Sequence, residues 1–112
     1  MESIKQKLLI AIKRSNKAYT YYLKDKKYYQ AKRIYKANEI VYNLLGEYIF
    51  IADKSHHDDI IDYIFHLEDW FEQFVAHEKL LNDSLNLDSC FSFIRKEESP
   101  SFPKQFVDEL SV

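Results

Sequence analysis

Histidine and carboxylate side chains gather between residues 56 and 78, a combination that can bind a metal ion or act as acid and base. They include His56, His57, Asp58, Asp59, His66, Glu68, Asp69, His77 and Glu78. On a continuous helix His66 and His77 share a face but stand about 16 Å apart along the axis. One ion cannot bind both, because each ligand must approach it to about 2 Å. The Glu-x-x-His pairs of di-iron bundles are also absent, since Tyr63 and Phe74 occupy the glutamate positions. We therefore expect no metal and no cofactor.

The residue patterns that other kinds of catalysis need are also absent from the sequence. No His follows an Arg by five to seven positions, which removes the catalytic pair of helical-bundle ribonucleases. The single glycine, Gly46, cannot build a phosphate-binding loop. The single cysteine, Cys90, lies among apolar residues with acids nearby, a setting that does not favour a reactive thiolate. The sequence therefore predicts a protein that is not an enzyme.

The length of 112 residues indicates one domain, 1–112, large enough to bury a core without disulfides. One cysteine fits a reducing compartment. The apolar stretch near the N-terminus spans only Leu8–Ile12, which is too short for a secretory signal. No run reaches the roughly 18 apolar residues that a membrane span needs. We expect a cytoplasmic protein.

The chain has only one Gly and two Pro, the residues that most often interrupt helices. We therefore expect helices joined by short loops to position these side chains. Apolar residues at helical spacing predict a first helix over about 3–23 and a second over about 27–45. Gly46 could cap the second helix or lie inside it, and we favour continuation to Ala52. Ser55, with Asp58 three residues later, resembles a capping box that starts a third helix running to about Leu81.

Two shorter elements follow in the sequence pattern. A fourth segment begins at Asp83 or Ser84 and ends before Pro100; its alternating apolar residues leave helix or strand open. Pro103 at a first helical position predicts a short terminal helix. The expected fold is all-α: an antiparallel up-down bundle of three long helices plus one or two shorter C-terminal helices.

Charge is strongly segregated along the chain. Residues 1–36 hold eleven Lys or Arg against two acids, whereas residues 37–112 hold five against sixteen, although the net charge is only −2. One explanation is internal: the basic first two helices lie near the acidic third. The other is a surface that meets a charged partner.

The stretch from Lys17 to Lys36 interleaves Lys and Arg with tyrosines. Such a pattern can follow phosphates while the rings stack on bases. It also suits a protein partner, because Tyr and Arg are enriched at interface hot spots. With nine Tyr, eight Phe and one Trp, a small bundle has more large rings than it can bury, which indicates an occupied groove.

Three blocks of residues resemble the flagellar secretion chaperone family, which escorts flagellin. They comprise Leu8 to Ala18, then Lys36 to Val41 with Leu44 and Leu45, and finally Asp62, Tyr63, Ile64 and Leu67. Members of that family are antiparallel helical bundles that hold the C-terminal segment of unpolymerised flagellin as helices along their outside, without ATP. The resemblance implies a chaperone that covers an apolar client helix until export. The residues expected to contact the client are Tyr19, Tyr22, Ile34, Tyr35 and Tyr42, although Tyr19 and Ile34 also fit a core position.

Two further functions remain open. One is a small stoichiometric inhibitor, meaning an immunity protein, an antitoxin or a phage-encoded antagonist of a nuclease or toxin. The other, third in order, is a nucleic-acid-associated subunit; the pI near 6.1 and the acidic C-terminal part work against non-specific binding of nucleic acid. For the chaperone and for the inhibitor the partner is another protein, either a client helix or a target enzyme. We expect no membrane as a partner. Association into a homo-oligomer is compatible with each of them.

Overall fold

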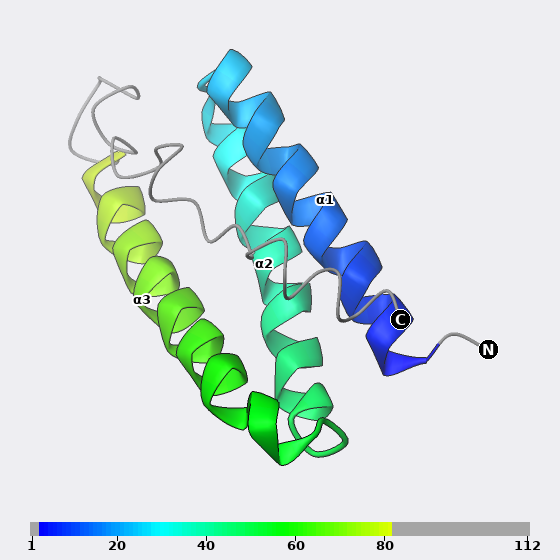
Figure 1. Ribbon diagram of the computed structural model, residues 1–112. Coiled ribbons are helices and arrows are strands. Elements are labelled where there is room, and N and C mark those ends of the chain that lie inside the picture. Colours follow the sequence, from blue (N-terminus) through cyan, green and yellow to red (C-terminus); the bar gives the residue numbers. More distant parts are fainter. Residues whose placement is uncertain (1–2, 82–112) are drawn as a thin grey trace.

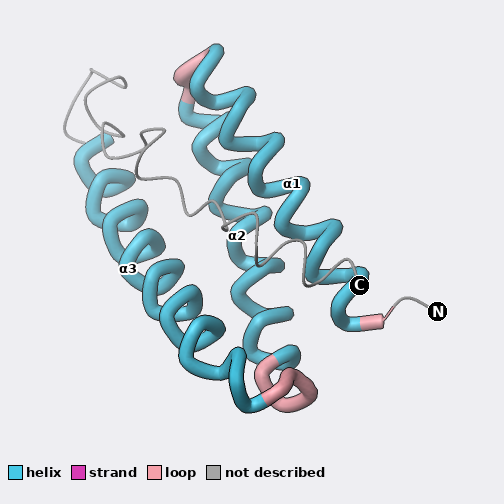
Figure 2. Tube along the Cα trace, viewed as in Figure 1, coloured by secondary structure: helices cyan, strands magenta, loops and turns pink. Residues whose placement is uncertain are grey.

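Three long helices make up most of the chain that the computed structural model describes, residues 3–81. They are α1 (Ile4–Lys24), α2 (Tyr28–Tyr48) and α3 (His57–Leu81), and a short 3-10 turn, η1 (Lys54–His56), precedes α3. The helices run up, down and up, with α2 between α1 and α3 (Figure 1), and short loops join them (Figure 2). The predicted all-α class is confirmed for these residues. The fourth segment and the terminal helix of the prediction lie outside them.

A capping box formed by Ser3 and Gln6 marks the start of α1. The N–H of Gln6 donates to the Ser3 hydroxyl at 3.2 Å, and the N–H of Ser3 donates to the Gln6 side chain at 3.0 Å. This reciprocal pair satisfies two backbone donors that a helix start leaves without partners. At the other end the Asp25 N–H bonds to the Tyr21 carbonyl at 3.0 Å. The bounds agree with the predicted 3–23 to within one residue.

The second helix passes through Gly46 but ends at Tyr48, so the predicted continuation to Ala52 is wrong. Gly46 does not have a positive φ and therefore is not a left-handed cap. Residues 49–52 form turns in which the N–H groups of Ile51 and Ala52 both reach the Tyr48 carbonyl, at 3.0 and 2.9 Å. The chain must reverse here to bring α3 alongside α2. The apolar run misled the prediction because Phe50 is 87% exposed instead of packing on a helix face.

The start of α3 also differs from the prediction. Ser55 lies inside η1, and α3 begins at His57. Asp58 and Asp59 occupy its first turn, where they interact favourably with the positive end of the helix dipole. The helix reaches Leu81, as predicted.

Two apolar clusters hold the three helices together. The buried residues of the first are Leu8, Ala11, Ile12, Val41, Leu45, Tyr48, Ile60 and Leu67. Those of the second are Tyr19, Tyr22, Ala31, Ile34, Trp70 and Phe74. Each cluster draws on all three helices. A buried hydrogen bond of 2.5 Å from the Ser15 hydroxyl to the Asn38 amide oxygen adds a polar link between α1 and α2.

Side-chain size explains how the helices are spaced. The backbones of α1 and α2 approach one another more closely than those of α2 and α3. Small buried residues such as Ala11, Ser15 and Ala31 permit the close contact. Aromatic rings fill the wider space between α2 and α3, and that space contains the candidate site. None of the helices in residues 3–81 has the length and apolarity needed to cross a membrane.

Candidate functional site

Tyr28, Tyr35 and Tyr42 recur every seven residues along α2, and we call them the tyrosine row. Seven residues are close to two helical turns, so the three side chains share one face of α2. All three contact α3. Tyr28 and Tyr42 bond through their hydroxyls to Glu78 and Glu68, whereas Tyr35 packs by its ring.

The upper end of the row is a polar cluster. The Tyr28 hydroxyl donates to Glu78, and the Lys32 ammonium lies 3.2 Å from the same carboxylate oxygen. The hydrogen bond from Tyr28 is the main cause that lowers the pKa of the Glu78 carboxyl; partial burial opposes it, and Lys32 adds to it. The bond to Glu78 likewise raises the pKa of Tyr28 and the pKa of Lys32. The cluster therefore favours a charged glutamate and protonated neighbours.

The middle of the row is aromatic. The Tyr35 ring lies 5.1 Å from the Phe71 ring and 4.8 Å from the Phe74 ring, measured between centroids. Trp70 stacks on Phe74 at 5.5 Å. Such contacts stabilise beyond the burial of area alone. These rings account for part of the aromatic surplus in the sequence, because they fill the space between α2 and α3.

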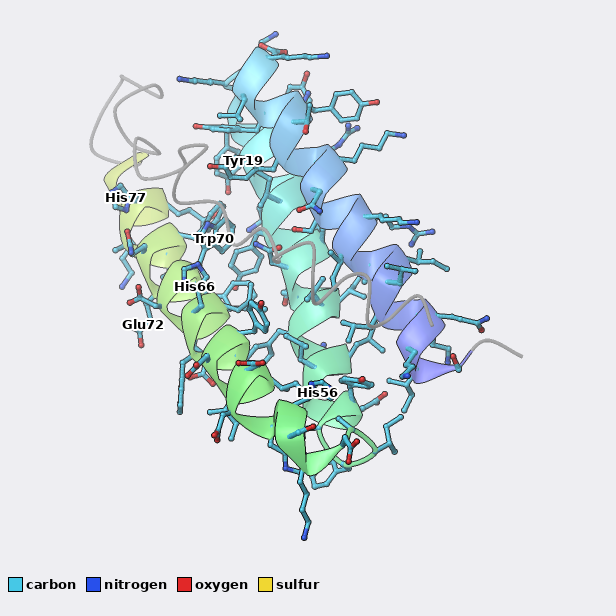
Figure 3. All side chains as sticks on the ribbon, in the orientation of Figure 1. Tyr19, His56, His66, Trp70, Glu72 and His77 are labelled. Carbon is cyan, nitrogen blue, oxygen red and sulfur yellow. The ribbon has the colours of Figure 1, made fainter. Side chains whose placement is uncertain are left out.

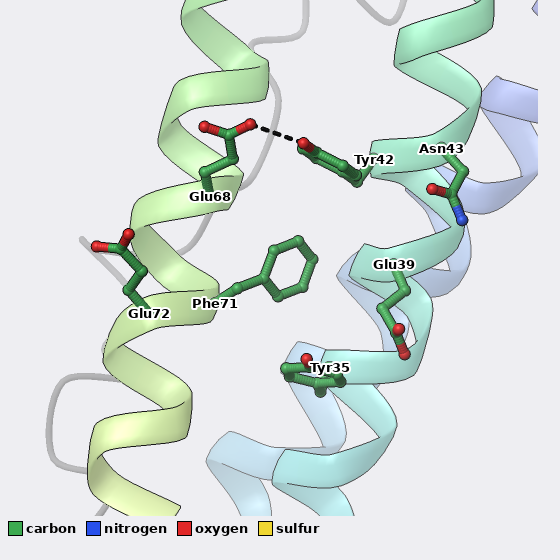
Figure 4. Close-up of a pocket in the computed structure, with 7 residues that line it drawn as sticks. All are labelled: Tyr35, Glu39, Tyr42, Asn43, Glu68, Phe71 and Glu72. Carbon is green, nitrogen blue, oxygen red and sulfur yellow. Dashed lines mark hydrogen bonds between the residues drawn. The ribbon is translucent and has the colours of Figure 1, made fainter.

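At the lower end the Tyr42 hydroxyl donates to the Glu68 carboxylate at 2.6 Å. This bond, followed by partial burial, raises the pKa of the Tyr42 hydroxyl. Figure 4 shows the bond beside Phe71, whose ring points from α3 toward α2. The ring centroids of Tyr42 and Phe71 are 5.8 Å apart, with the rings almost perpendicular.

An open groove of about 450 Å³ lies along this part of the row, and we call it the α2–α3 groove. Its lining residues are Tyr35, Glu39, Tyr42, Asn43, Glu68, Phe71 and Glu72. The rings of Tyr42 and Phe71 lie between the two helices, Glu39 and Glu72 are exposed, and the Glu72 side chain points away from α2 (Figure 4). The described lining residues include no thiol, imidazole or aliphatic hydroxyl that could act as a nucleophile next to a base. The groove is suited to binding an apolar surface that carries positive charge.

The structure separates the five predicted client contacts into two groups. Tyr19, Tyr22 and Ile34 are buried in the core at 5%, 2% and 0% exposure. They are not at the surface in this conformation, and for Tyr19 and Ile34 the alternative core position is the one observed. Tyr35 and Tyr42 line the α2–α3 groove.

Sequence reasoning missed the groove residues on α3, which include Phe71 and Glu72. It named contacts only from the first two helices, because nothing in the local pattern ties a residue of α3 to the face of α2. The available signal was the tyrosine row, because its seven-residue spacing marks one continuous contact line on α2. A row of contact residues on α2 implies a matching row of contact residues on the helix that packs against it, α3.

The histidines and acids considered for metal binding do not converge. Figure 3 shows His56, His66 and His77 spread along the length of the molecule. His57 and His77 contact the backbone carbonyls of Ala52 and Gln73, at 3.2 and 2.7 Å. Within the described part of the chain, no three His, Cys, Asp or Glu residues are placed to hold an ion.

Two other tyrosines of the basic stretch, Tyr21 and Tyr29, do not line the groove. Tyr21 and Tyr29 are 44% and 50% exposed, and each has a cation above its ring. The Lys17 ammonium lies 5.9 Å from the Tyr21 centroid, and the Arg33 guanidinium lies 5.8 Å from that of Tyr29. These pairs keep the rings and the cations together at the surface.

The charge segregation stays largely on the outside of the molecule. α1 carries no acid and six cations, namely Lys5, Lys7, Lys13, Arg14, Lys17 and Lys24. α3 carries Lys79 and seven acids, namely Asp58, Asp59, Asp62, Glu68, Asp69, Glu72 and Glu78. Among residues 3–79, Lys32–Glu78 is the one ion pair that joins two different helices, and its cation comes from α2. Internal pairing therefore leaves the charges of α1 and most of those of α3 to the solvent.

No protein-family model matches this chain, and no curated protein or solved structure is significantly similar to it.

Proposed function

We propose that this protein is a non-enzymatic helical bundle that binds another protein, and that it covers an apolar client helix in the manner of a flagellin-type export chaperone. The observation that carries this proposal is the α2–α3 groove, whose lining combines aromatic rings with carboxylates. A helix bound in a groove contributes anchors at positions i, i+3, i+4 and i+7, which rings can receive. The family resemblance of the sequence points the same way.

Exposed apolar side chains extend the binding surface along α3. Ile61 and Phe65 are 37% and 61% exposed, and they lie on the flank of α3 that also carries Glu68 and Glu72. A client helix that covers the groove would also shield these two side chains. Isolated exposed apolar residues are common, but residues next to a ring-lined groove form a continuous patch.

The experiment is co-purification from the native host with a groove variant and a matched control. Asn43→Arg/Glu72→Arg places two long cations at exposed positions of the groove. Asn16→Arg/Asp62→Arg makes the same charge change at exposed positions outside it. We expect the wild type and the control to retain the same partner and the groove variant to lose it.

A second measurement identifies the surface that is used. Partner binding should slow hydrogen exchange in residues 35–43 and 65–72. Since coupled folding of a client helix buries apolar area, titration of the purified partner should give a large negative heat-capacity change. Retention of the partner by the groove variant, with no protection of these segments, would contradict the proposal.

A stoichiometric inhibitor is the second candidate, and the outer face of α1 favours it. A surface with cations and no acid attracts an acidic enzyme from a distance, so the association rate would fall steeply with salt. The groove variant and a charge reversal on α1, Arg14→Glu/Lys17→Glu, distinguish the candidates: an inhibitor acting through α1 would lose its target in the second variant and keep it in the first.

A further inference from the structure

We infer that the protein binds a second copy of itself, with the outer face of α1 on one molecule lying along the outer face of α3 on the other. This contact does not involve a client, but its α3 side includes Glu68 and Glu72 of the α2–α3 groove, so a bound client would compete with it. It is based on two rows of exposed side chains with the same spacing and opposite charge.

The α1 stripe consists of Ile10, Arg14, Lys17, Tyr21 and Lys24. These residues are separated by four, three, four and three positions, the spacing of a helix–helix contact line. All five are exposed, including Ile10 at 38% and Tyr21 at 44%. Ile10 and Arg14 also border an open hollow of about 460 Å³ between α1 and α2, so the stripe has a concave neighbour.

The α3 stripe consists of Ile61, Phe65, Glu68, Glu72 and Val75, with the identical spacing. Ile61, Phe65 and Val75 are 37%, 61% and 40% exposed, and Glu72 is also exposed. Glu68 is half-buried and bonds to Tyr42 through one carboxylate oxygen, which leaves its second oxygen for another donor. Both stripes thus combine apolar and charged side chains along one helix face.

In an antiparallel alignment the intervals run 4, 3, 4, 3 on α1 and 3, 4, 3, 4 on α3, so the two stripes match to within one residue at every position. Ile10 meets Val75, Tyr21 meets Phe65, and the cations Arg14 and Lys17 meet Glu72 and Glu68. Only the last pair, Lys24 with Ile61, joins unlike groups, and there the aliphatic part of the lysine can cover the isoleucine. Order, length and charge therefore all fit.

The four charges needed for this contact are not paired with opposite charges among residues 3–79. Arg14 and Glu72 form no ion pair there, Lys17 lies over the Tyr21 ring of its own stripe, and Glu68 accepts a hydrogen bond from the neutral Tyr42 hydroxyl. Because the net charge is only −2, two copies do not strongly repel one another. Exposed ion pairs are weak individually and are screened by salt, so the association should be weak and salt-dependent.

The contact joins two different surfaces, which makes it heterologous. Each molecule in such a pair still has one unused stripe, so the contact can repeat and form rings or chains. The average mass should therefore rise with protein concentration.

Sedimentation of the purified full chain, without any client, tests the inference. We expect a mass above that of the monomer at about 0.02 M salt and a monomer at about 0.5 M, where the Debye length is only a few Å. Arg14→Glu/Lys17→Glu reverses the α1 stripe. On α3, Asp69→Lys/Glu72→Lys reverses Glu72 of the stripe and its exposed neighbour Asp69, and it keeps Glu68 because that residue bonds to Tyr42. All four positions are exposed, so both variants should remain folded.

Two combinations of the reversed variants should restore association, and they provide the decisive test. Each reversed variant alone should stay monomeric at low salt. An equimolar mixture of the two should associate, and so should one chain that carries all four substitutions. The matched controls Lys26→Glu/Lys54→Glu and Glu47→Lys/Asp53→Lys change the same charges at exposed positions away from both stripes and should associate like the wild type.

Three results would overturn the inference. They are a monomeric wild type at low salt, association that survives either reversal, and controls that lose association as fully as the stripe variants. Because no client is present, failure here says nothing against the α2–α3 groove, whose own test is the loss of a co-purified partner.

Discussion

The Ser15 hydroxyl and the Asn38 amide oxygen form a 2.5 Å hydrogen bond inside an otherwise apolar contact between α1 and α2. Asn38 is fully buried, and its amide nitrogen has no hydrogen-bond partner among the described residues. A buried polar pair of this kind contributes little net free energy when intact and costs much when half of it is removed. It also disfavours other registers of the two helices, which would leave both groups unpaired.

The first prediction concerns this pair. Ser15→Ala leaves the Asn38 oxygen buried without its donor, so the free energy of unfolding should fall by about 1–3 kcal/mol. The double variant Ser15→Ala/Asn38→Leu removes both polar groups and should be more stable than the single variant. Urea denaturation, monitored through the fluorescence of Trp70, measures the free energy of unfolding of both variants. Thr20→Ala, an exposed hydroxyl on the same helix, is the control and should change stability by less than about 0.5 kcal/mol.

The second prediction concerns the rings between α2 and α3. Phe74 is fully buried, whereas Phe65 on the same helix is 61% exposed. Phe74→Ala should lower the free energy of unfolding by about 3–5 kcal/mol because it opens a cavity among Tyr35 and Trp70. Phe65→Ala should cost less than about 0.5 kcal/mol in the absence of a partner. Similar losses for the two variants would show that α3 is not packed as described.

The third prediction concerns pH. The pKa of Glu78 is lowered in the folded state, chiefly by the hydrogen bond from Tyr28, so its contribution to stability is present above the unfolded value of about 4.3. That contribution is lost as the pH falls through the lower folded value. A carbon-detected NMR titration of the Glu78 carboxyl should give a midpoint below the ordinary value, and Tyr28→Phe should raise the midpoint.

Tyr29→Phe is the matched control for that titration. Tyr29 is adjacent in sequence and half-exposed, and its ring lies beneath Arg33. It should leave the Glu78 midpoint unchanged. Equal effects of the two substitutions would mean that Glu78 responds to the helix as a whole and not to the Tyr28 hydroxyl.

The fourth prediction concerns Gly46. Its backbone is helical, and a Cβ built there meets no atom within 4 Å. Gly46→Ala should therefore raise the free energy of unfolding by about 0.5–1 kcal/mol, since alanine loses less backbone entropy in a helix. A thermal melt checks it. A lower melting temperature would indicate that the α2 C-terminus needs glycine for a reason that the described residues do not show.

Helix periodicity was enough to predict the first three helices and most of their buried positions. Leu8 and Ile12, for example, follow one another at helical spacing, and so do Leu67 and Phe74, and all four are fully buried. The error at residues 49–52 arose because an apolar run was taken as evidence for a continued helix. The requirement that the chain turn back there is a tertiary constraint, and local periodicity does not contain it.

The candidate site was harder to predict than the fold. Tyr22 and Tyr35 both lie on helices among basic residues, yet one is buried in the core and the other lines the groove. Their difference depends on where α3 packs, and that is a non-local contact. The tyrosine row was visible in the sequence, but the identity of its partners Glu68, Phe71 and Glu78 required the register between α2 and α3.

The unequal spacing of the helices has a consequence for the order of folding. α1 and α2 are close in sequence and joined by three residues, so their contact closes a short loop at little entropic cost. α3 can dock only after the reversal at residues 49–56. The α1–α2 hairpin should therefore form first, even while the rest of the chain is still on the ribosome. Pulse-labelled exchange during refolding should protect the amides of α1 and α2 before those of α3.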